Sequence, residues 1–280
     1  MKSLKPRLLT AAIGIPSVVL VIILSEMWSP LVGIVVGLAS GLMVGEYLFA
    51  KKLLRFVPLA VVSIAYAIAV PNLIYWSALC YIATFVFLML AFIFSLTKHE
   101  ELDFLSMAYA MFGTLLITFG MSAVSAACCL NNLSVSFYFV LIFALPWMAD
   151  AGGFFVGSML GRHKLCPKIS PKKTVEGVIG GIVFCLASAI VMGLVFQTWI
   201  LDGRLRVNYI ALAVIAVLDS VLSVVGDLSF SWIKRSLNIK DYGSIFPGHG
   251  GMLDRCDSII FTAPLVIAIG YYLPFITVME

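Results

Sequence analysis

The segment 231–257, with the sequence SWIKRSLNIKDYGSIFPGHGGMLDRCD, concentrates chemically active side chains in an otherwise apolar chain. Its basic residues suit phosphate groups, its carboxylates suit a metal ion, and its turn at 247–251 reads PGHGG. Glycine permits positive φ and close approach of the backbone to a ligand, so successive N–H groups could form an anion cradle. His249 could bond a phosphate or only stabilise the turn. The segment therefore predicts a phosphate site.

Two carboxylates border this segment in a way that suits a divalent cation. Asp227 ends one apolar run and Asp254 begins the next, so both are expected on the same side of a membrane. Mg²⁺ takes oxygen ligands from one or two carboxylates and from substrate phosphates. The alternatives are pairing of Asp227 with a buried donor and interaction of Asp254 with a helix dipole. For Asp219, on the same predicted helix as Asp227, we favour pairing over an ion site.

A second charged loop, 161–176, contains the sequence ISPKKTVEG at 169–177. Ser170 followed by Pro171 is typical of an N-cap and a first helical position. Lys172 and Lys173 would then lie in the first turn of a helix, where the dipole disfavours cations. We expect an anion there, and attraction to lipid headgroups is the alternative.

The composition defines the class of protein. The chain has 280 residues, of which 62% are hydrophobic and 11% charged, and its mean hydropathy is +1.11. Soluble domains carry about 25% charged residues, so we expect an integral membrane protein. We expect an all-α polytopic membrane protein with about nine transmembrane helices. The nine apolar runs are 8–25, 30–50, 56–71, 73–97, 104–130, 133–160, 177–200, 207–230 and 257–276.

Basic residues predict the orientation. If the N-terminus is cytoplasmic, all of the 18 lysines and arginines except Arg204 and Arg206 fall in cytoplasmic segments. Loops 161–176 and 231–256 then face the cytoplasm. We found no internal repeat or hydrophilic linker, and so expect one membrane domain, 1–280. Within it, 1–145 would be a helical scaffold and 146–280 the catalytic part.

The charged segments together resemble a known family. From Ser231 to Asp257 the pattern S-x-[apolar]-K-R-x₄-K-D-x-G-x₂-F-P-x-H-G-G-[apolar]-x-D-R-x-D is similar to the signature of phosphatidate cytidylyltransferases, also called CDP-diacylglycerol synthases. The segments 150–157, 169–177 and 226–231 also resemble this family. The likeness is closest over 146–257, whereas 1–145 resembles the family only in hydropathy and length. Cys256 departs from the usual aliphatic residue, and the Ala-Gly after Asp150 departs from a common Thr-containing sequence.

The resemblance implies the reaction of CTP with phosphatidate to give CDP-diacylglycerol and pyrophosphate. The lipid phosphate would attack the α-phosphorus of CTP in line, so no enzyme nucleophile is required. It also implies Mg²⁺, a second cation such as K⁺, and a homodimer in a bacterial inner membrane with the active site facing the cytoplasm. The partners would be CTP, phosphatidate and membrane lipids, with no nucleic acid.

The residues and the resemblance together give a predicted site. Its cations would neutralise phosphate charge. The two lysines of the second loop would bind either the lipid phosphate or the triphosphate. Asp257 would orient Arg255 or bind a metal. The metal ligands would be Asp227 and Asp254. The catalytic residues would be Lys234, Arg235, Lys240, Asp241, His249, Arg255 and Asp257. The substrate-binding residues would be Asp150, Ser170, Lys172, Lys173, Thr174, Ser231, Gly250 and Gly251.

Three other readings fit parts of the sequence. An ion-coupled secondary transporter would use Asp150 and Asp219 as an ion path, although most charge lies in the two loops. Another CTP-dependent lipid enzyme, such as a CDP-archaeol synthase or a polyprenol kinase, would share the phosphate chemistry. A structural lipid-binding scaffold would leave the glycine turn between carboxylates unexplained.

Overall fold

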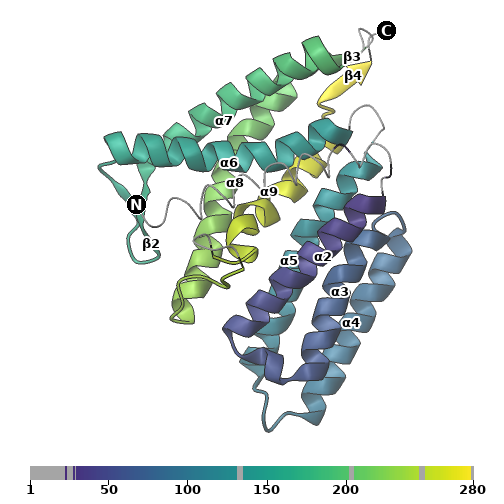
Figure 1. Ribbon diagram of the computed structural model, residues 1–280. Helices are drawn as coiled ribbons and strands as arrows, with labels where there is room; N and C mark the ends of the chain where they lie inside the picture. The colour runs from purple at the N-terminus through teal and green to yellow at the C-terminus, as the bar shows by residue number, and fades with distance from the viewer. Residues whose placement is uncertain are drawn as a thin grey trace. The chain divides into compact units, whose positions relative to one another are not determined.

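The fold is seen in a computed structural model that describes residues 23, 28, 30–130, 135–201, 205–245 and 250–278. Helices dominate these residues (Figure 1). The chain forms two compact units, and each is described separately. Unit 1 takes the chain up to Cys129 together with Lys234–Ile260, and unit 2 takes Leu130–Ile233 and the chain from Phe261 onward. The residues expected in one catalytic part, 146–280, are therefore distributed over both units.

Unit 1 contains four helices that run side by side in alternating directions (Figure 1). Short connections favour antiparallel neighbours of this kind. The close approach of the first two helices depends on small residues, because a Cβ atom at Gly37 would lie 2.5 Å from the carbonyl oxygen of Ile68. The helices are α2 (Pro30–Ala50), α3 (Val57–Leu73), α4 (Ser77–Thr97) and α5 (Phe104–Ala126), with short 3₁₀ turns at Leu53–Arg55 and Ala127–Cys129.

Charge in unit 1 lies at one end of these helices. The connections 51–56 and 98–103 carry lysine, arginine and acidic residues, whereas the connections 74–76 and 127–129 at the opposite end carry no charged residue. Met252 and Leu253 lie at the charged end, since their backbone N–H groups donate to Glu46 near the end of α2. This segregation is what an asymmetric membrane environment favours.

Unit 2 contains a pair of long helices joined by a strand hairpin. Helix α6 (Val135–Leu160) leads into β1 (Lys164–Cys166) and β2 (Ser170–Thr174), which pair antiparallel, and α7 (Val175–Val195) follows. Small residues allow α6 and α7 to approach closely, since a Cβ atom at Gly152 would lie 2.8 Å from the carbonyl oxygen of Gly180. The hairpin is thus held at the end of a tightly packed helix pair.

The remaining elements extend the two units. A π-helical turn at Phe196–Ile200 follows α7, and β3 (Leu205–Val207) pairs antiparallel with β4 (Ile276–Val278). Helix α8 (Tyr209–Ser236) begins in unit 2 and ends in unit 1, and α9 (Leu253–Tyr272) begins in unit 1 and ends in unit 2.

The polytopic helical class predicted from composition is confirmed. Six helical segments of the described chain are long and apolar enough to cross a membrane: Pro30–Ala50, Ser77–Thr97, Phe104–Cys129, Val135–Leu160, Val175–Ile200 and Tyr209–Ser236. Helix α3 is shorter and α9 begins with charged residues, while the predicted span 8–25 lies outside the described residues apart from residue 23. Nine spans and a cytoplasmic N-terminus stay predictions, and the two small strand pairs were not expected.

The predicted helix start at Ser170 is wrong. Ser170 begins strand β2, and the N-cap of α7 is Thr174, whose hydroxyl accepts a hydrogen bond from the N–H of Gly177 at 3.1 Å. The observed start places acidic Glu176 in the first turn, which suits the helix dipole. Lys172 and Lys173 instead lie on the strand, so the dipole argument for an anion beside them no longer applies.

Candidate functional site

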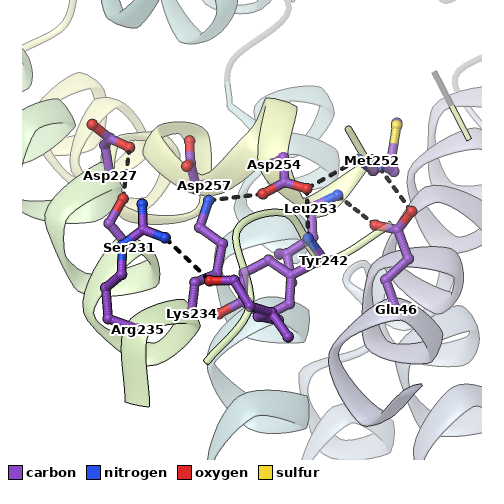
Figure 2. A network of polar contacts seen from close by, with 12 residues as sticks. Glu46, Asp227, Ser231, Lys234, Arg235, Tyr242, Met252, Leu253, Asp254 and Asp257 are labelled. Atoms are coloured by element: carbon purple, nitrogen blue, oxygen red, sulfur yellow. Dashed lines mark hydrogen bonds and ion pairs between the residues drawn. The ribbon is translucent and has the colours of Figure 1, made fainter. Parts of the chain in front are cut away.

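Asp254 is the centre of a buried polar network in unit 1 (Figure 2). One of its carboxylate oxygens accepts a hydrogen bond from the ammonium of Lys234 at 2.7 Å. The other accepts from the backbone N–H groups of Tyr242 at 2.8 Å and Gly251 at 3.0 Å. A single carboxylate therefore ties together the end of α8, the loop after it and the glycine turn.

Lys234 is buried within this network. Its side chain is 10% exposed, and that of Asp254 is 2% exposed. The ammonium also lies 5.5 Å from the centre of the Tyr242 ring, a cation–π distance. Buried charges require such pairing, so Lys234 positions the loop rather than facing solvent.

Tyr242 forms the buried side of the loop. Burial raises the pKa of its phenol well above the usual value, and the neighbouring Tyr47, Asp254 and Asp257 act in the same direction. The phenol therefore stays protonated and neutral across the physiological pH range. Its ring lies 6.1 Å from that of Tyr47 on α2, which anchors the loop to the helices of unit 1.

Other cations of the same segment face solvent. Arg235, Lys240 and Arg255 are exposed, as is Asp241. The guanidinium of Arg235 donates to the carbonyl oxygen of Ile239 at 3.2 Å, which orients it along the loop. These cations face solvent, and arginine suits bidentate contact with phosphate.

The glycine turn has a structural role in addition to the cradle predicted for it. Gly250 has φ +85°, a conformation that side chains rarely adopt, and a Cβ atom there would lie 2.9 Å from a carboxylate oxygen of Asp254. The N–H of Gly251 donates a hydrogen bond to Asp254, so it does not point toward a ligand.

Two further predicted site residues of this segment lie differently. Asp257 is buried and accepts a hydrogen bond from the N–H of Ser258 at 2.8 Å. His249 lies outside the described residues.

Unit 2 contains a second cluster, in which one lysine meets two carboxylates. The ammonium of Lys173 on β2 lies 2.6 Å from Asp227 on α8 and 3.9 Å from Asp150 on α6. The hydroxyl of Ser231 donates to Asp227 at 3.4 Å (Figure 2). Two carboxylates around one ammonium leave a net negative charge, so the cluster can accept further positive charge.

The hairpin fixes this lysine in place. The side chain of Glu176 accepts from the backbone N–H of His163 at 3.2 Å and lies 2.6 Å from its ring nitrogen. Thr174 is buried and caps α7, so its hydroxyl is used for structure. Lys172 is exposed and Ser170 is partly exposed. Of these residues, the hairpin brings only Lys173 to the carboxylates.

The fit of a magnesium ion differs between the two carboxylates predicted to hold one. No group of three or more His, Cys, Asp or Glu residues around a common point occurs in the described ranges. The oxygens of Asp254 are engaged by three donors, which does not fit a metal ligand in this arrangement. Asp227 and Asp150 do fit, because they share a cation and are partly exposed, with side chains 27% and 52% accessible.

Two residues of the network were missed by sequence reasoning. Glu46 was a detectable signal, since an acid inside the apolar run 30–50 is a functional candidate by default. Tyr242 lies within the signature segment 231–257 but carries no charge, so only the structure shows that it is buried against Tyr47.

The fold and the two clusters define a polytopic helical membrane protein with lysine–carboxylate sites and exposed cations at the ends of its helices. Comparison with known proteins identifies the family. A profile of the cytidylyltransferase family matches residues 5–273, so the chain belongs to this family. The family prediction made from the sequence is thereby confirmed.

Curated relatives agree with this assignment. The chain is 48% identical over 120 residues to a phosphatidate cytidylyltransferase of Bacillus subtilis (strain 168), covering 43% of this chain and 42% of the relative. It is 41% identical over 129 residues to one of Staphylococcus haemolyticus and 42% identical over 129 residues to one of Staphylococcus aureus (strain COL), in each case covering 46% of this chain and 47% of the relative. The match thus spans less than half the length of these relatives.

Proposed function

We propose that this protein is a membrane nucleotidyltransferase that converts CTP and phosphatidate into CDP-diacylglycerol and pyrophosphate. Membership of the cytidylyltransferase family and similarity to phosphatidate cytidylyltransferases support this activity. The observation that carries it is the convergence of Lys173, Asp227 and Asp150 from three elements beside a hairpin rich in basic residues. Such a cluster suits the handling of several phosphate groups.

The proposed reaction requires positioning rather than a protein nucleophile. An oxygen of the lipid phosphate forms a bond to the α-phosphorus of CTP. The bond from that phosphorus to the oxygen bridging to the β-phosphate breaks, and pyrophosphate leaves with the electron pair. Both substrates are anions, so the protein must reduce their mutual repulsion and hold them in line.

Exposed and buried cations have different parts in this proposal. Arg235, Lys240 and Arg255 neutralise the phosphate charge of CTP and of the departing pyrophosphate. Lys173, held by its two carboxylates, binds a phosphate oxygen of one substrate, and Lys172 adds charge at the hairpin surface. Lys234 and Asp254 join the end of α8, which carries Arg235, to the start of α9, which carries Arg255.

A magnesium ion fits this proposal at Asp227 and Asp150. When bound, it would supply positive charge that stabilises the phosphates and the leaving pyrophosphate. Ser231 orients Asp227 through its hydroxyl. The proposal also includes a second cation such as K⁺ and a homodimer. It places the active site on the cytoplasmic side of a bacterial inner membrane, and the charge segregation in unit 1 supports this orientation.

One assay tests the proposed function. Purified full-length protein in detergent micelles receives phosphatidate, Mg²⁺ and CTP labelled in the cytidine. We expect labelled CDP-diacylglycerol and an equal amount of pyrophosphate. Labelling of a polyprenol or archaeol acceptor but not of phosphatidate would overturn the substrate assignment. Ion uptake into proteoliposomes without nucleotide, together with no labelled lipid, would favour the transporter.

A further inference from the structure

Glu46 makes an unexpected contact across unit 1. It lies on α2, and its two carboxylate oxygens accept hydrogen bonds from the backbone N–H groups of Met252 at 3.0 Å and Leu253 at 2.9 Å (Figure 2). These partners are more than 200 positions away in the sequence, at the start of α9. Glu46 is 8% exposed, so these are buried charge-assisted hydrogen bonds.

The contact suits the chemistry of a helix start. The first N–H groups of a helix have no partner within it, and a carboxylate there is favoured by the helix dipole. Glu46 supplies this partner from another helix, while Asp254 accepts the N–H of Gly251 from within the first turn. The N–H groups of residues 251, 252 and 253 are therefore all bonded to carboxylates.

The backbone at Gly251 and Gly243 also lies close against the Glu46 carboxylate. A Cβ atom at Gly251 would collide with both of its oxygens, and one at Gly243 would collide with one of them. Two glycines of the signature segment thus allow the backbone to approach this one side chain. The position of Gly251 and the start of α9 therefore depends on Glu46 as well as on Asp254.

A buried carboxylate is a costly way to fill space, because an apolar side chain would avoid the desolvation penalty. Its two hydrogen bonds to Met252 and Leu253 offset this cost while the start of α9 stays beside α2. We propose that Glu46 is a positioning residue for the transfer reaction. It fixes the start of α9, from which Asp254 holds Lys234 and Tyr242, and so sets where the exposed cations meet CTP. This inference rests on the proposed function.

The first test separates positioning from helix packing. Glu46→Gln keeps the volume but replaces one acceptor by a donor group, and Ser40→Ala, a buried change on the same helix, is the control. We expect kcat/KM for CTP to fall about tenfold or more in Glu46→Gln, since each hydrogen bond to a charged group is worth about that factor. KM for phosphatidate should stay unchanged. Equal kcat/KM for CTP in the two variants would overturn the proposal.

A double-mutant cycle tests the contact itself. Gly251→Ala should reduce activity in the wild-type background, because the new methyl group meets Glu46. In the Glu46→Ala background the same change should cost less, because the obstruction is removed. Losses that simply multiply would show that the two residues do not act through this contact.

Hydrogen exchange tests the geometry without the reaction. In the full chain, the amides of Met252 and Leu253 should exchange faster in Glu46→Gln than in wild type, and Ser40→Ala should not change them. Unchanged protection of these amides would overturn the inference even if the enzyme is active. If these amides exchange faster in Glu46→Gln but the wild-type protein makes no labelled lipid, the contact would be supported and the proposed function rejected.

Discussion

The ammonium of Lys234 and the carboxylate of Asp254 form a buried ion pair at 2.7 Å. Sequence reasoning assigned one residue to catalysis and the other to a metal, whereas the structure joins them to each other. A buried pair exposes little surface to a ligand, and its attraction holds two parts of the chain together. We therefore expect the two residues to affect the proposed reaction by holding the end of α8 to the start of α9.

Breaking this pair should destabilise the protein. In Asp254→Asn, the ammonium of Lys234 stays buried without a counter-charge, and removal of one partner of such a pair costs about 3–5 kcal/mol. We expect a lower melting temperature in detergent, measured by tryptophan fluorescence. Asp241→Asn, an exposed change in the same loop, should lie within about 0.5 kcal/mol of wild type. An unchanged melting temperature in Asp254→Asn would contradict the buried pair.

The two lysines of the hairpin should differ in importance. Lys173 lies between Asp227 and Asp150, whereas Lys172 is exposed. We expect Lys173→Met to lower kcat/KM by about 100-fold, because a positioned cation on a phosphate supplies roughly this factor. Lys172→Met should lower it by about threefold, in line with a surface charge. Initial rates over both substrates give the comparison, and equal losses would refute the assignment of Lys173.

Magnesium dependence should distinguish the carboxylates. If Asp227 and Asp150 hold the ion, Asp227→Asn and Asp150→Asn should each raise the Mg²⁺ concentration for half-maximal activity by about tenfold or more. Asp254→Asn should reduce kcat without moving this concentration, since its oxygens are already engaged. The measurement is activity against free Mg²⁺ after removal of metal with a chelator. If only Asp254→Asn changed the Mg²⁺ concentration for half-maximal activity, Asp254 rather than Asp227 and Asp150 would be the metal ligand.

The predictable part of the fold is the part dictated by hydropathy. The runs 30–50 and 133–160 coincide with α2 and α6 because apolar length alone determines a membrane helix. Ser170 was misread because Ser-Pro suits both a helix start and a strand, and only the pairing of β2 with β1 decides between them.

The residue types of the site were predictable from the sequence, but the contacts between these residues were not. Charge in an apolar chain indicated Asp227, Lys173 and Asp254. Which carboxylate meets which lysine depends on contacts between distant segments, as in the hydrogen bonds from Met252 and Leu253 to Glu46. No local pattern in the sequence contains that information.

Asp219 should be dispensable for stability, unlike Asp254. It is fully buried in α8, and neither carboxyl oxygen has a hydrogen-bond partner among the described residues, although the hydroxyl of Thr262 lies beside it. A buried carboxyl without such partners is unfavourable, so Asp219→Asn removes a potential charge at equal volume. We expect a melting temperature equal to or above that of wild type and kcat/KM within about twofold, as for a residue outside the reaction. Thr262→Val is the matched control, since it tests the neighbouring hydroxyl at nearly constant volume. A loss of stability or activity in Asp219→Asn that Thr262→Val does not share would show that the carboxyl itself has a role in this protein.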